Sequence, residues 1–93
     1  MINTDNLLKK IGFYQTLEIL DISGRAISLR TFYEKLIKKG SYYNAFIRIK
    51  DAMITTGIIE IYYEKTNSTK RIRLTQKGKT IKQTINALLE LIG

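Results

Sequence analysis

The stretch from Ser41 to Gly57 constrains the fold of this chain more than any other part of the sequence. Its apolar side chains recur at three- and four-residue spacing, which predicts an amphipathic helix of about four turns. The Ser41 hydroxyl can cap the start of this helix, and Gly57 can adopt the left-handed conformation that ends one. The predicted inward face consists of Tyr42, Ala45, Phe46, Ile49, Ala52 and Met53. We therefore expect this helix to lie against the core.

The opposite face of the same helix is not an ordinary solvated surface. It carries an aromatic ring, aliphatic side chains and charges of both signs, with Asn44 and Arg48 on its flank. Such a mixture can read base edges in the major groove of DNA, where an amide pairs with adenine and an arginine with guanine. A helix of this composition can equally pack against another element or a second subunit. The residues of this face are Tyr43, Ile47, Lys50, Asp51 and Ile54.

Two further helices are predicted before this stretch, over residues 4–21 and 29–39. Gly12 weakens the first helix and can divide it into a short N-terminal arm and a core helix. Ser28 can cap the second helix, whose apolar residues also recur at helical spacing. Only two residues, the first of them Gly40, need separate the second helix from the third. Two helices joined by a short glycine-containing turn make a helix-turn-helix.

A β-hairpin is predicted after the third helix. Residues 58–64 are rich in β-branched and aromatic side chains, residues 71–75 alternate between polar and apolar, and residues 65–70 between them are polar with an Asn-Ser tip. Residues 25–27 can add a third strand. The basic side chains of the hairpin are Lys65, Lys70, Arg71 and Arg73. We expect them to form a basic projection, although charges on a hairpin can also serve only to prevent aggregation at a sheet edge.

The last predicted helix runs from residue 76 to about residue 92, with Thr75 as its cap. Part of its apolar surface is an a/d seam, which is narrower than the stripe of most globular helices. We expect this seam to form a homodimer, helped by the wide apolar surface of the first helix around Phe13 and Ile19. A monomer could instead bury the seam against that first helix. The predicted dimer contacts are Ile81, Ile85, Leu88 and Ile92.

The composition limits both the chemistry and the partners of this single small domain, residues 1–93. Sixteen Lys and Arg against eight Asp and Glu give a net charge of +8 and a pI near 9.8, which attracts nucleic acid first and anionic membrane second. The absence of cysteine and histidine excludes thiol and imidazole catalysis, disulfides and thiolate metal sites. With no nucleotide-binding motif and no acidic cluster at metal-ligand spacing, we expect no enzyme and no cofactor.

No basic segment followed by an apolar run opens the sequence, and no apolar stretch approaches the roughly 20 residues of a membrane span. We therefore expect a cytoplasmic protein with no membrane partner.

Three motifs resemble the winged helix-turn-helix of MarR-, PadR- and ArsR-like transcription regulators, including small archaeal and archaeal-virus examples. They are Ser41-Tyr-Tyr-Asn44, Met53-x-x-x-Gly57-Ile-Ile59 and Leu74-Thr-Gln-Lys-Gly-Lys79. The resemblance covers about residues 13–80 and implies an α+β fold with three helices, a β-hairpin wing and a C-terminal helix over about residues 76–92. The chain lacks the long dimerisation helices of the larger regulators, and no pocket for a small-molecule effector is evident.

The resemblance also implies how the chain would bind double-stranded DNA. The third helix would lie in the major groove, backbone amides at residues 41–44 would anchor a phosphate, and the wing would contact the backbone or minor groove. The residues implied in or beside the major groove are Ser41, Tyr42, Tyr43, Asn44, Ile47, Arg48 and Lys50.

The sequence therefore predicts a sequence-specific, DNA-binding transcription regulator that acts as a homodimer. Two alternatives remain open. One is an architectural protein that binds DNA with little sequence preference. The other is a protein-interaction module in which Tyr43, Ile47 and Ile54 contact another protein.

Overall fold

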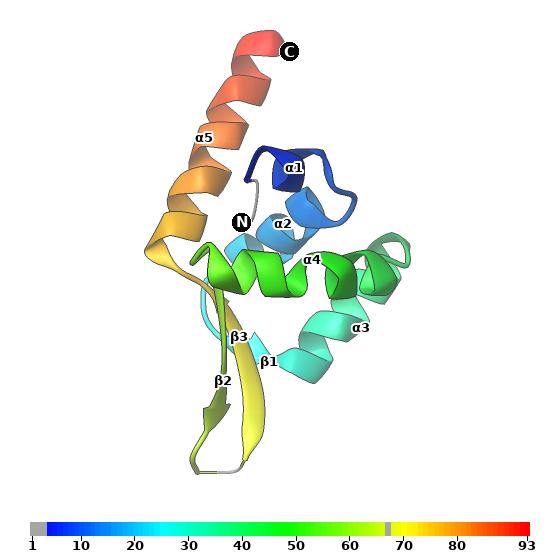
Figure 1. Ribbon diagram of the computed structural model, residues 1–93, viewed down its shortest axis with the longest axis vertical. Helices are drawn as coiled ribbons and strands as arrows, with labels where there is room; N and C mark the ends of the chain where they lie inside the picture. Colours follow the sequence, from blue (N-terminus) through cyan, green and yellow to red (C-terminus); the bar gives the residue numbers. More distant parts are fainter. Residues whose placement is uncertain (1–3, 67) are drawn as a thin grey trace.

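The computed structural model describes residues 4–66 and 68–93, so Asn67 in the predicted hairpin tip lies outside the described residues. Within them the chain has an α+β fold with five helices and one three-stranded antiparallel sheet (Figure 1). In chain order the elements are α1 (Thr4–Lys9), α2 (Phe13–Ser23), β1 (Ile27–Ser28), α3 (Leu29–Gly40), α4 (Tyr43–Thr55), β2 (Ile59–Glu64), β3 (Thr69–Leu74) and α5 (Gln76–Ile92). The α+β class expected from the sequence is confirmed.

The sheet has the strand order β1-β3-β2, and both pairings are antiparallel. Strands β2 and β3 form the predicted hairpin, in which Ile61 lies opposite Ile72 and Glu60 lies opposite Arg73. The short β1 pairs Ile27 with Ile72 and covers the other edge of β3. The predicted third strand is therefore confirmed, although it begins two residues later than the sequence indicated.

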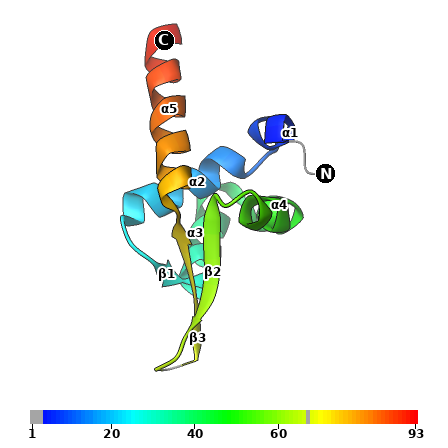
Figure 2. The same cartoon turned by 60° about the vertical axis from the view of Figure 1, so that its left-hand side comes forward.

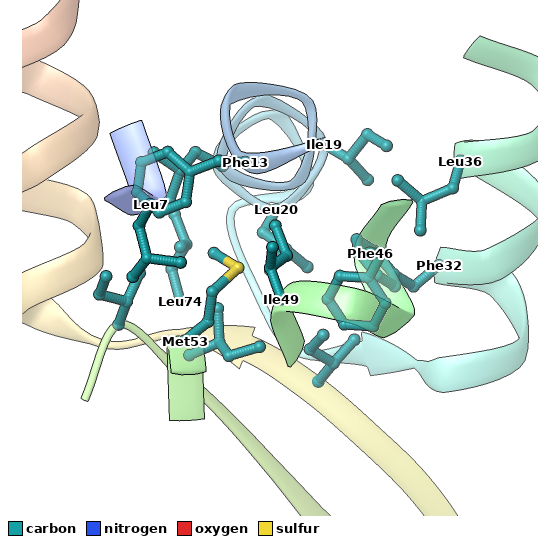
Figure 3. Close-up of a cluster of buried hydrophobic side chains, with 14 residues drawn as sticks. Leu7, Phe13, Ile19, Leu20, Phe32, Leu36, Phe46, Ile49, Met53 and Leu74 are labelled. Carbon is teal, nitrogen blue, oxygen red and sulfur yellow. The ribbon is translucent and has the colours of Figure 1, made fainter. Parts of the chain in front are cut away.

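The core lies between the helices and one face of the sheet, and the inward face of α4 is at its centre (Figure 3). Phe46, Ile49 and Met53 of α4 are buried, as the helical periodicity predicted. Phe46 also meets Phe32 of α3 edge-on, with ring centroids 4.8 Å apart. Each of these large side chains contributes on the order of 1.5–3 kcal/mol by burial. This packing fixes which side of α4 is left for solvent.

The first predicted helix, over residues 4–21, is two helices separated at Gly12. Gly12 has a φ of 93°, a left-handed conformation that side chains rarely adopt. It also lies so close to α4 that a Cβ there would be 3.0 Å from the Cβ of Ala45. The Thr16 hydroxyl donates to the Gly12 carbonyl at 2.7 Å, and the Gly12 amide donates to the Gln15 side chain at 3.1 Å. The predicted division at Gly12 is thus confirmed. It lets α1 and α2 both contact α4.

The expected capping role of Ser41 is wrong. Ser41 has a φ of 63° and ends α3, where its amide donates to the Ile37 carbonyl at 3.0 Å. The next amide, of Tyr42, donates to the Leu36 carbonyl at 3.1 Å. A connection of only two residues commits Ser41 to closing the preceding helix, so its hydroxyl cannot begin the next one. Helix α4 starts at Tyr43 with no side-chain cap.

The other two predicted caps are confirmed. The Ser28 hydroxyl accepts from the Thr31 amide at 3.1 Å, and the Thr75 hydroxyl oxygen accepts from the Gly78 amide at 3.0 Å. The Thr75 amide donates to the Ile58 carbonyl at 3.1 Å, which fastens the start of α5 to the connection after α4. From this attachment α5 passes beside α2, and its C-terminal end extends beyond the other elements and away from the hairpin (Figures 1 and 2).

Candidate nucleic-acid interface

The outward face of α4 is solvent-exposed at most of the predicted positions. Asn44, Ile47 and Arg48 are exposed, whereas Lys50 is half-buried. Tyr42 is also half-buried and packs against the core, because it lies on the inward side of the helix start. Ser41 is exposed in the turn before the helix. The structure therefore brings an amide, an aliphatic side chain and a guanidinium together on one accessible helix surface.

An aromatic cluster supports the N-terminal end of this surface. The Tyr43 ring on α4 packs edge-on against Tyr33 of α3, with centroids 4.8 Å apart, and remains 37% exposed. Tyr33 in turn contacts Phe46 and Phe32. Burial raises the pKa of the Tyr33 hydroxyl, and the neighbouring Tyr43 raises it further. Tyr43 is thus held in place at the edge of the exposed face.

The start of α4 presents backbone donors. The amide of Phe46 donates to the Tyr42 carbonyl at 2.9 Å. Tyr42, the residue that precedes the helix, makes no side-chain hydrogen bond to the amides of the first turn. Uncapped amides at a helix start, together with the helix dipole, favour an anion at this end. Because Ser41 ends α3, its hydroxyl does not occupy these donors.

The hairpin carries less unpaired positive charge than its sequence suggests. Nε of Arg71 donates to a carboxylate oxygen of Glu64 at 2.7 Å. Nε and Nη2 of Arg73 both donate to one oxygen of Glu60, at 3.2 and 2.9 Å. The sequence alone did not predict these pairs, although the antiparallel register that sets Glu60 opposite Arg73 is a signal that could have indicated one of them.

Two lysines supply the remaining charge of the hairpin. Lys65 and Lys70 are exposed and make no ion pair within the part of the chain that the structure describes. The ammonium of Lys70 lies 5.3 Å from the centre of the Tyr63 ring, a contact that leaves its charge accessible. Figures 1 and 2 show the hairpin projecting beyond the helices, so these lysines lie toward the far end of that projection.

The predicted dimer seam on α5 is divided between the core and solvent. Ile81 and Ile85 are half-buried against the core, as the monomer alternative required. Leu88 and Ile92 are 55% and 76% exposed, as a dimer contact would require. An apolar groove of about 490 Å³ runs between α1 and α5. Its apolar lining residues are Leu7, Leu8, Phe13, Ile58, Ile81, Ile85 and Leu88.

A buried lysine on α5 contacts α2. Lys82 is only 5% exposed, and its ammonium lies 3.1 Å from Oδ1 of Asn86 and 5.0 Å from the centre of the Tyr14 ring on α2. Nearby, Lys39 of α3 pairs with Glu18 of α2, and this hydrogen bond lowers the pKa of the Glu18 carboxyl. These polar contacts tie α2 to both α3 and α5. No sequence pattern indicated them, because they depend on tertiary packing.

Comparison of the chain with protein-family models, curated proteins and solved structures finds no match. Among residues 4–66 and 68–93, no helix is long and apolar enough to cross a membrane. The same residues contain no group of three or more acidic side chains arranged to hold a metal ion.

Proposed function

We propose that this chain is a winged helix-turn-helix protein that binds double-stranded DNA sequence-specifically and regulates transcription as a homodimer. The observation that carries the proposal is the exposed face of α4. Asn44 and Ile47 stand on a helix whose opposite face is locked into the core, so their positions are set before any partner binds. A rigid helix with an exposed amide and an exposed aliphatic side chain suits the base edges of a major groove.

In this proposal α3 and α4 form the helix-turn-helix, and the β2–β3 hairpin is the wing. Asn44 would pair with adenine, and Ile47 and the edge of Tyr43 would contact thymine methyl groups. The uncapped amides at the start of α4 would bind a backbone phosphate. Lys65 and Lys70 would bring the wing to the backbone, where they position the protein without specifying sequence. Arg71 and Arg73 would contribute less, since each is already paired with a glutamate.

The homodimer would use the exposed end of α5. Leu88, Leu91 and Ile92 form an apolar surface beyond the core, continuous with the groove beside α1. Two-fold symmetry would set the paired recognition helices roughly 34 Å apart, one turn of the duplex. Since the proposed partner is cellular DNA, we propose that the dimer acts in the cytoplasm.

Selection of bound sequences from a pool of random duplexes tests this function. A two-fold symmetric enriched sequence is the expected result, because two α4 helices related by symmetry would read two equal half-sites. Binding without enrichment would favour an architectural protein and contradict specific regulation. Failure to bind any duplex would contradict the proposal and favour a protein-interaction module, for which exposed Tyr43, Ile47 and Ile54 would supply the surface.

A further inference from the structure

A basic hollow lies beside α4, next to the connection between α1 and α2. Its volume is about 340 Å³, and its lining consists of Lys9, Lys10, Ile11, Ala45, Arg48 and Ile49. Three of these six residues are cationic, and none is acidic. The hollow is therefore a concentration of positive charge contributed by two elements that are far apart in the sequence.

The two lysines lie on a fixed part of the chain. Leu7 and Phe13, on either side of the connection, are both buried in the core. The Lys10 amide donates to the Leu7 carbonyl at 3.1 Å, and the Phe13 amide donates to the Lys10 carbonyl at 3.3 Å. Close contact of Gly12 with Ala45 holds the connection against α4. The backbone that carries the lysines is thus positioned relative to Arg48.

The three cations have no partner of their own within the part of the chain that the structure describes. The ion pairs there join other residues, and Lys9, Lys10 and Arg48 are all exposed. Three like charges around one hollow repel each other, and an anion in the hollow would remove that cost. A guanidinium with two ammonium groups offers donors for the several oxygens of a phosphate.

We infer that Lys9, Lys10 and Arg48 together bind one phosphate of the DNA backbone next to the bases that α4 reads. This inference rests on the proposed function and extends it. It makes the α1–α2 connection a third contact with DNA, in addition to α4 and the wing. It also assigns Arg48 to positioning the protein, in contrast to the sequence analysis, which placed Arg48 among the residues that read bases.

Two variants and a control test the assignment on the selected duplex and on random duplexes. Lys9→Ala/Lys10→Ala and Arg48→Ala should each weaken binding to both DNAs by the same factor, roughly 5- to 10-fold for each cation removed at 0.1 M salt. Because the three cations share one phosphate, the slope of log K against log salt should become less steep by about one for each protomer when all three are removed. The control, Lys35→Ala/Lys38→Ala, removes two exposed lysines of α3 that do not line the hollow, and should change binding less. Far-UV circular dichroism should confirm that every variant is folded.

A set of duplexes with one neutral methylphosphonate at successive positions locates the phosphate. One substitution should weaken binding of the original protein and leave the Lys9→Ala/Lys10→Ala/Arg48→Ala variant unaffected. The inference is overturned if the lysine variant binds like the control, or if Arg48→Ala alters the preference at a single base pair. If the original protein binds no duplex, the proposed function fails together with the inference. If the original protein binds duplexes and the variants bind equally well, only the inference fails.

Discussion

Replacing Gly78 with alanine tests whether α5 is held against the connection between α4 and β2 as the structure indicates. Gly78 lies in the first turn of α5, where alanine alone would favour the helix by about 1 kcal/mol. A Cβ at this position would lie 2.3 Å from the Ile58 carbonyl oxygen and 2.8 Å from Cδ2 of Leu74. Both distances are far below ordinary contact, so both neighbours or the helix itself must shift.

Neither neighbour can move cheaply. The Ile58 carbonyl accepts from the amide of Thr75 at 3.1 Å and from its hydroxyl at 3.0 Å, and Leu74 is buried in the core. Overpacking costs about 1–3 kcal/mol, and each weakened hydrogen bond costs about 1 kcal/mol. After subtracting the gain in helix propensity, we expect Gly78→Ala to lower the free energy of unfolding by about 2–4 kcal/mol. For a chain of this size, that is a fall in Tm of at least roughly 8 °C.

Thermal and urea unfolding followed by far-UV circular dichroism measure this difference. Ala87→Gly is the matched control, since it makes the reverse exchange at an exposed position of the same helix and should cost only about 1 kcal/mol. If Gly78→Ala were as stable as the original protein, or more stable, the close approach of α5 to Ile58 would be refuted.

Three further predictions concern binding and assembly. Asn44→Ala should weaken the binding free energy by about 1–3 kcal/mol on the selected duplex and by less on random DNA. Lys70→Ala should weaken binding to both DNAs equally, and titrations on the two DNAs distinguish these outcomes. Glu64→Gln should strengthen binding to every duplex and steepen its salt dependence, because it frees the Arg71 guanidinium; unchanged affinity would show that this arginine does not approach DNA. Leu88→Gln should give a folded monomer by sedimentation, since Leu88 is exposed on the proposed dimer surface; a variant that still dimerises would place the interface elsewhere.

Features that depend on near neighbours in the chain could be predicted from the sequence. The caps at Ser28 and Thr75 follow from a hydroxyl three residues before an amide that needs an acceptor. The burial of Phe46 and Met53 follows from helical periodicity. The capping role of Ser41 was predicted wrongly. In a two-residue connection the same residue can end the preceding helix or cap the following one, and Ser41 ends the preceding helix.

Features that depend on tertiary packing could not be predicted in this way. The burial of Lys82 arises where α5 crosses α2, and nothing in its neighbouring sequence distinguishes it from the exposed lysines of α5. The basic hollow exists because Gly12 brings Lys9 and Lys10 beside Arg48, across more than thirty positions of sequence. The pairing of Arg73 with Glu60 could be predicted only from the strand register of the hairpin.

The salt dependence of affinity for duplex DNA tests the central claim most directly. Each protomer offers five cations on the proposed surface that form no ion pair among the described residues, namely Lys9, Lys10, Arg48, Lys65 and Lys70. A dimer that places roughly 6–10 such groups near phosphates should give a slope of log K against log salt of about −5 to −9. A slope near zero, or no measurable binding at low salt, would contradict the account of this chain as a DNA-binding protein.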